Sequence, residues 1–298
     1  MPGEVIPLRP LTLGELLDAA LELLRRNAIG LLPIAVVLAL AEQLALLPLR
    51  SDAGLRPPAY LATGGGFFGY WLVLAAGMGT EAVAIGLLGG LAGRVAAPAL
   101  IRGASGPRWL LGRGARLGRL ILLVAIVGTV AMLSTAVALL FTGTDSFGDP
   151  TTTVFTWLTA LLPWLFWYLF SGLAGPALVL ERRGPVGALV RSFRLVAGSG
   201  WRPGWIRLLG YLAWLAVRIA LAVGGLAVLR LFAGLPAAGW PVLVATTVWT
   251  LVNGVAYAVL GCLDAVLLVE ARMRVEGLDL ALGRAARQGV APERILVG

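Results

Sequence analysis

The sequence of 298 residues contains no histidine and no lysine, and its one cysteine is Cys262. Without histidine, this chain cannot supply a Ser-His-Asp triad, an imidazole general base or a His-ligated zinc or haem site. Without lysine, it cannot form the Gly-Lys motif that cradles phosphates. A single cysteine excludes an intrachain disulfide and a thiolate cluster, and Cys262 lies in an apolar run typical of a small buried residue. We therefore expect no metal, no cofactor and no enzymatic activity.

Charged residues are scarce as well, at 13% of the sequence, whereas 59% is hydrophobic and the mean hydropathy is +0.91. A soluble fold of this size would have too little polar material to cover its surface. The formal net charge of +9 comes from arginines that mostly flank apolar segments, where anionic lipid headgroups are the expected partner. Nucleic acid is not expected, since it requires a clustered basic face on a soluble domain.

Six apolar segments are long enough to cross a hydrocarbon core of about 30 Å. Arginines concentrate before the first segment, between the second and third, between the fourth and fifth, and after the sixth. By the positive-inside rule, both termini and these basic segments are expected on the cytoplasmic side of a bacterial inner membrane. The approximate bounds of the six segments are 28–49, 67–93, 118–141, 154–180, 205–232 and 241–269.

Residues 12–26 predict a separate amphipathic helix before the first span. Thr12 and Glu15 have the spacing of a capping box, in which each side chain satisfies a backbone N–H of the other residue. Apolar residues recur at helical spacing from Leu13 to Leu24, opposite acidic ones. These acidic residues interrupt the stretch where a cleavable signal would have its apolar core. The apolar face could lie in the membrane interface or pack on the helix bundle.

An internal repeat links the basic segments. Residues 98–117 align without gaps on residues 176–195, and both copies carry Gly, Leu, Arg and Arg at the same spacing, which recurs after residue 277. The repeat predicts basic amphipathic helices whose arginines point away from an apolar face. These arginines could dock lipid or a partner protein. Alternatively, the helices only orient the hairpins. The predicted docking arginines are Arg113, Arg116, Arg191, Arg194, Arg284 and Arg287.

These patterns predict an all-α membrane protein with six transmembrane helices arranged as three repeated hairpins, each preceded by a cytoplasmic amphipathic helix. Residues 1–298 form a single polytopic membrane domain. Its expected parts are the N-terminal amphipathic helix (1–27), the first hairpin (28–93), a basic helix with the second hairpin (98–180), a basic helix with the third hairpin (182–269) and a basic tail (270–298).

Charged residues inside the predicted spans are unfavourable by a few kcal/mol each and usually mark a pathway or a pair. Glu42, Glu81 and Arg218 all lie about 20 Å from the cytoplasmic ends of their spans, at 1.5 Å per residue. Equal depth predicts an ion pair between Glu81 and Arg218, with Glu42 as the competing partner and an aromatic ring over the guanidinium. The complete predicted cluster is Glu42, Glu81, Arg218, Asn253, Tyr257 and Asp264.

Two further patterns concern packing and membrane position. Gly86-x-x-x-Gly90 predicts a close approach of another helix to the second span. Tryptophans near the predicted span ends are typical of anchors at the membrane–water interface. They are Trp71, Trp157, Trp205 and Trp240.

Three segments together resemble one known family: residues 7–20 (PLRPLTLGELLDAA), residues 188–202 (ALVRSFRLVAGSGWR) and residues 270–280 (EARMRVEGLDL). This is the actinobacterial-type family named after the membrane domain of glycerophosphoryl diester phosphodiesterases. In the enzymes that give the family its name, the membrane domain precedes a catalytic barrel that relies on histidine and metal-binding carboxylates. This chain has no histidine and no room for the barrel, so the resemblance implies the membrane module without the phosphodiesterase.

The leading expectation is a non-enzymatic inner-membrane scaffold or complex subunit that docks anionic lipid or a membrane or cytoplasmic protein through its basic helices. The alternative is a transporter or channel that uses the intramembrane polar cluster. One structural feature separates the two hypotheses, namely whether the polar residues enclose a water-accessible cavity. A dry interior in which every polar group is paired favours the scaffold.

Overall fold

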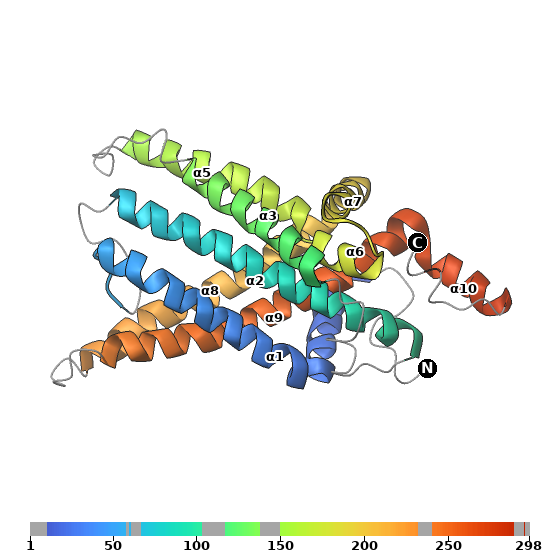
Figure 1. The fold of residues 1–298 in the computed structure, drawn as a ribbon, viewed down its shortest axis with the longest axis horizontal. Helices are drawn as coiled ribbons and strands as arrows, with labels where there is room; N and C mark the ends of the chain where they lie inside the picture. The colour runs from blue at the N-terminus through green and yellow to red at the C-terminus, as the bar shows by residue number, and fades with distance from the viewer. Residues whose placement is uncertain are drawn as a thin grey trace.

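The computed structural model describes residues 11–57, 60, 67–102, 117–137, 150–231, 240–288 and 295, and these ranges contain α-helices and no strand. Figure 1 shows the helices as a bundle of long, roughly aligned rods with shorter helices at one end. In chain order they are α1 (Leu13–Asp52), α2 (Phe67–Arg102), α3 (Leu117–Ala136), α5 (Pro150–Ser171), α6 (Ala174–Leu180), α7 (Pro185–Gly198), α8 (Arg202–Leu231), α9 (Trp240–Glu276) and α10 (Leu278–Gln288).

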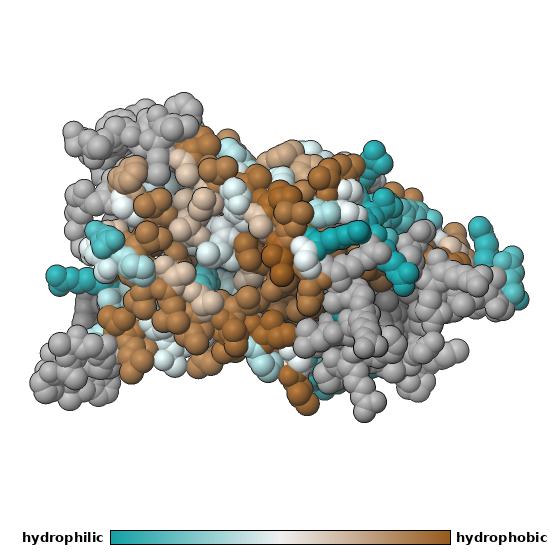
Figure 2. Space-filling model, viewed as in Figure 1, coloured by the Kyte–Doolittle hydropathy of each residue, from teal (hydrophilic) through white to brown (hydrophobic). Residues whose placement is uncertain are grey.

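Six helical stretches of the described chain are long and apolar enough to cross a membrane. They support the prediction of a multi-pass, all-α membrane protein. Figure 2 shows apolar side chains spread over the middle of the molecule and hydrophilic ones toward its ends. The stretches are Leu13–Asp52, Phe68–Ala96, Leu117–Ala136, Trp157–Leu180, Arg202–Gly225 and Pro241–Glu276.

Helix α2 lies at the centre of the bundle, with α1, α3, α6 and α9 packed against it, and α1 also packs along α9 (Figure 1). The span in α9 is the most buried of the six. We call the end of the bundle that holds the start of α1, α7, the start of α8 and α10 the arginine-rich end. The opposite end holds the last turns of α1 and the first turns of α2 and α9. These two ends locate the polar sites described below.

Helix α1 begins with the predicted capping box. The Thr12 amide donates to Glu15 Oε2 over 2.8 Å, and the Glu15 amide donates to Thr12 Oγ1 over 3.4 Å. Further along, Asn27 departs from helical geometry, with φ −116° and ψ 15°, and its side chain donates to the Leu23 carbonyl over 2.8 Å. One face of the helix before this kink is buried, formed by Leu16, Ala19, Ala20 and Leu23. The first part of α1 therefore packs on the bundle, which decides between the two positions left open by the sequence.

The predicted close approach at Gly86 and Gly90 is confirmed. A Cβ atom added to Gly90 would lie 2.6 Å from a methyl carbon of Leu120 on α3, and one added to Gly86 would lie 3.1 Å from Val124. On α6, a Cβ atom added to Gly175 would lie 2.6 Å from the Gly86 carbonyl oxygen. Glycine at these positions lets the α6 backbone approach that of α2 and lets side chains of α3 pack directly on the α2 backbone.

The prediction that Trp71 is an interface anchor is wrong. Trp71 is only 1% exposed, and its ring centre lies 4.9 Å from that of Trp157 on α5. Its position on α2 faces the bundle, so the indole fills the core. Trp157 and Trp205 are both substantially exposed, as an anchor requires. The side chain of Trp240 lies outside the described set.

Candidate functional site

The predicted ion pair between Glu81 on α2 and Arg218 on α8 is confirmed. Arg218 donates to both carboxylate oxygens of Glu81, over 2.6 Å to Oε1 and 3.1 Å to Oε2. The Tyr211 hydroxyl donates to Oε2 over 3.3 Å. The Arg218 guanidinium lies 5.8 Å from the ring centre of Tyr211 and 5.6 Å from that of Tyr257. Two parallel hydrogen bonds and two aromatic rings hold this charge inside the bundle.

Glu42 on α1 is held differently. The Tyr257 hydroxyl donates to Glu42 Oε2 over 2.6 Å, and the Thr80 hydroxyl contacts Oε1 over 3.3 Å. Glu42 is 7% exposed, and no described arginine forms an ion pair with it, since Arg218 pairs with Glu81 instead. A carboxylate within a span therefore relies on neutral hydroxyl groups alone.

Polar residues recur at helical spacing along α9, which predicts a stripe that faces protein or water rather than lipid. Thr246, Thr250, Asn253 and Tyr257 are all buried. Yet the Asn253 side-chain oxygen has no hydrogen-bond partner within the described ranges, and the same holds for the Thr246 and Thr250 hydroxyl oxygens and for Arg218 Nε. Buried polar atoms are rarely left in this state without water, an ion or a ligand nearby.

Arg218, Asn253 and Tyr257 line a cavity of about 270 Å³ between α1, α2, α8 and α9. Its inner end, near the middle of the bundle, is formed by Glu42, Glu81 and Arg218 together with tyrosine rings. Asn253 and Trp249 on α9 also line the cavity. They lie one and two turns from Tyr257, toward the opposite end of the bundle. The volume lies just below the usual range for small-molecule pockets. The polar cluster therefore encloses space for a small solute, which is the feature that separates the two functional hypotheses.

The outer end of this cavity contains a second charge, Arg50. Arg50 donates to Gln43 Oε1 over 2.8 Å, and its guanidinium lies 4.2 Å from the ring centre of Tyr60. Among the described residues, no carboxylate pairs with Arg50. Tyr60 has a left-handed backbone conformation (φ 50°), which is unfavourable for a bulky residue. The sequence analysis did not single out Arg50 or Tyr60, because the contact between them depends on the path of the chain after α1.

A groove of about 480 Å³ lies on the other side of Glu42, between α1, α2 and α3. Most of its lining is apolar and small, including Ala45, Ala76 and Gly79. Glu42 lines both the groove and the cavity. This carboxylate therefore lies at the boundary between the polar interior and the apolar side of α1 and α2.

Asp264, the remaining member of the predicted cluster, does not line this cavity. It lies seven residues beyond Tyr257 on α9, two turns nearer the arginine-rich end, where Arg207 Nε donates to Asp264 Oδ1 over 2.7 Å. Arg207 also donates to the Tyr168 carbonyl oxygen, and its guanidinium lies 3.8 Å from the Tyr168 ring centre. In the sequence, Arg207 is the last of six arginines from Arg182 to Arg207, which are predicted to lie between the fourth and fifth spans. The structure buries it in the first turns of α8.

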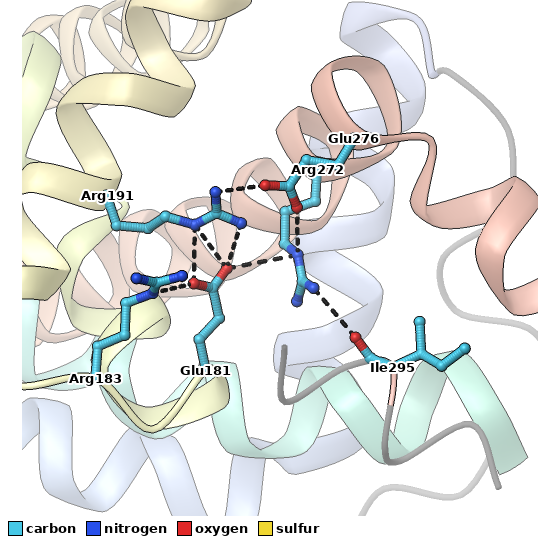
Figure 3. A network of polar contacts seen from close by, with 6 residues as sticks. All are labelled: Glu181, Arg183, Arg191, Arg272, Glu276 and Ile295. Atoms are coloured by element: carbon cyan, nitrogen blue, oxygen red, sulfur yellow. Dashed lines mark hydrogen bonds and ion pairs between the residues drawn. The ribbon is translucent and has the colours of Figure 1, made fainter.

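Figure 3 shows a second charged network, at the arginine-rich end, centred on Glu181 between α6 and α7. Glu181 accepts from Arg183 Nε over 2.6 Å and from Arg191 Nε over 2.8 Å, and Arg272 Nε lies 3.5 Å from it. Arg191 and Arg272 also pair with Glu276 at the end of α9. A third group joins Glu270 to Arg202 and Arg274. These shared carboxylates connect α7, α8 and α9.

The network corrects the predicted role of Arg191. Its side chain is only 15% exposed and lies between Glu181 and Glu276, so it is not free to dock lipid. Burial alone would lower the pKa of Arg191, but the hydrogen bonds to Glu276 and Glu181 raise it above the ordinary value. Arg194, Arg284 and Arg287 are exposed, as docking requires, whereas Arg113 and Arg116 lie outside the described residues.

Comparison with models of known protein families, with curated proteins and with solved structures finds no match. The lone cysteine, Cys262, is fully buried, and no group of metal-ligating side chains is found in the part of the chain that the structure describes.

Proposed function

We propose that this protein is a non-enzymatic, multi-pass protein of the bacterial inner membrane that binds a small polar solute in the cavity between α1, α2, α8 and α9. It acts as a transporter or channel, the alternative of the two functions weighed from the sequence. One observation carries this proposal, namely a cavity lined by charged and polar side chains inside a membrane-spanning bundle, with a buried amide oxygen of Asn253 that has no hydrogen-bond partner among the described residues.

The energetics favour a ligand or water in this cavity. An unsatisfied buried polar group destabilises a protein by about 1–3 kcal/mol, and a charge at the membrane centre by a few kcal/mol more. Packing alone would be served better by apolar residues at Glu42 and Asn253. A polar solute that enters the cavity satisfies these groups and offsets their burial.

In this proposal both termini and the arginine-rich end are cytoplasmic, by the positive-inside rule. The outer end of the cavity, at Arg50, then faces the other side of the membrane. The three repeated hairpins and the resemblance to the phosphodiesterase membrane-domain family belong to the same proposal. The hairpins and the resemblance both refer to the membrane module that forms the cavity.

A second candidate function is the scaffold, and the exposed arginines favour it. Arg194 on α7 and Arg284 and Arg287 on α10 are exposed at the arginine-rich end. On α7, Val186 and Val190 are exposed as well, so this helix presents an apolar face beside a basic one. Such a surface suits the inner leaflet with its anionic headgroups, or a protein partner.

Cysteine labelling tests the cavity and its orientation together. Because Cys262 is the only cysteine, Cys262→Ala gives a cysteine-free background. In it, we expect Asn253→Cys to react with a small membrane-impermeant thiol reagent added outside intact cells, since a thiolate forms only where water reaches it. Two controls on α9 should not react: Val255→Cys, which faces outward, and Ala258→Cys, which is buried.

Reaction only in inverted vesicles would reverse the orientation and leave the cavity intact. If Asn253→Cys behaves like Ala258→Cys from both sides, water does not reach the cavity, and the proposed function is wrong.

A further inference from the structure

We propose that the cavity binds a small zwitterion whose cationic group lies at Glu42 and whose anionic group lies at Arg50, with several bonds between the two charges. This inference rests on the proposed function and names its ligand class. It follows from the position of two charges in the cavity lining that are not paired with each other or with any other described charge.

The inner end of the cavity favours a cation. Within the described part of the chain, Glu42 receives hydrogen bonds from Tyr257 and Thr80 and has no cation at ion-pair distance. The amide oxygen of Asn253 is a second free acceptor one turn away along α9. Glu81 does not compete for a cation, because Arg218 occupies both of its oxygens. An ammonium group, with three donors, suits this set of oxygen atoms.

The outer end favours an anion. Arg50 has a neutral hydrogen-bond partner, Gln43, and an aromatic one, Tyr60. A guanidinium has five N–H donors in a planar fork, and a carboxylate is the ligand that matches this geometry. The unpaired charge at this end is therefore opposite in sign to the unpaired charge at the inner end.

The separation of the two charges sets the length of the ligand. Glu42 and Arg50 are eight residues apart on α1, about 12 Å along the helix axis, but the Arg50 side chain reaches back to Gln43, so the two charged groups are closer together than the two backbone positions. The lining contains two carboxylates and two guanidinium groups, so its formal charge is zero, and a simple anion or cation would leave one end unmatched. An α-amino acid carries its charges on neighbouring carbons, so it spans less of the cavity than a zwitterion with several bonds between its charges.

The test uses the purified full-length protein in detergent and four probes of related structure. These are 4-aminobutyrate, butylammonium, butyrate and alanine, each at equal concentration and ionic strength. We expect 4-aminobutyrate to raise the Tm by about 2–4 °C, because a ligand that binds only the folded state stabilises it. The other three should give less than half of this shift. Equal shifts from butyrate or butylammonium, or no shift from 4-aminobutyrate, would overturn the proposal.

Two variants locate the ends of the ligand. Glu42→Gln removes the negative charge but keeps a polar side chain that can still contact Tyr257 and Thr80. Arg50→Gln removes the positive charge at the outer end. Each should abolish the shift from 4-aminobutyrate, whereas the control Glu22→Gln, outside the cavity, should keep it. If Glu42→Gln does not fold, Arg50→Gln alone decides, and an unchanged shift in it would contradict the proposal. If Asn253→Cys is labelled but 4-aminobutyrate does not bind, the ligand proposal is wrong and the proposed function still holds.

Discussion

The two charged regions of this protein differ in how many arginines each carboxylate contacts. At the arginine-rich end, Glu181, Glu270 and Glu276 each contact two or more arginines. In the middle of the bundle, among the residues that the structure describes, Glu81 pairs with one arginine and Glu42 with none. Both regions bury carboxylates, and the second lines a cavity. The contrast indicates that the arginine-rich end joins helices together, whereas the intramembrane cluster leaves charged and polar groups available to bind a ligand.

The largest effect should come from breaking the intramembrane pair. Arg218→Leu leaves Glu81 buried without its cation, and we expect a loss of about 3–5 kcal/mol of stability, by analogy with broken buried pairs. The double variant Arg218→Leu/Glu81→Leu should recover most of it, because no charge is then left unpaired. Thermal unfolding in detergent measures both, with the exposed Arg194→Leu as a control that changes little.

Absence of recovery in the double variant would mean that the two residues do not act as a pair. Function measured in the same cells then separates their roles. Restored stability with lost function argues for a solute pathway, and restoration of both argues for packing.

A smaller loss is expected at the arginine-rich end. Glu181→Gln removes the carboxylate shared by Arg183, Arg191 and Arg272 and leaves these guanidinium groups close together. We expect a loss of about 2–3 kcal/mol, less than for a fully buried pair, since Glu276 and water still serve the arginines. Thermal unfolding measures it. The matched control Glu22→Gln breaks an i, i+4 pair at the surface and should have little effect. Equal shifts for the two variants would show that the network adds no stability.

The smallest effect tests whether hydroxyl groups hold Glu42. Tyr257→Phe removes the hydrogen bond of 2.6 Å to Glu42 and should lower stability by about 1–2 kcal/mol. Tyr168→Phe is the matched control, because the Tyr168 hydroxyl is buried without a hydrogen-bond partner in the described structure, and its removal should be neutral. The prediction fails if both variants unfold at the same temperature.

Depth along the spans was enough to predict the pair between Glu81 and Arg218, and capping chemistry was enough to predict the start of α1 at Thr12. The same reasoning failed for Asp264. Arginine density grouped its partner Arg207 with the arginines between spans, because sequence spacing does not reveal how deeply the first turn of α8 enters the bundle. Trp71 failed for a similar reason, since position near a span end says nothing of the direction that the indole faces.

The amino-acid sequence by itself determined that this is a helical membrane protein, roughly where its spans run and which polar residues lie within them. These properties follow from apolar length, helical period and the unfavourable burial of charge, all of which are local in the chain. Only the tertiary structure decided that Arg191 joins Glu181 and Glu276, that Glu42 has no cation, and that Arg50 and Asn253 share a cavity with it. These properties depend on the rotation of each helix about its axis and on the gaps left between side chains from helices distant in sequence.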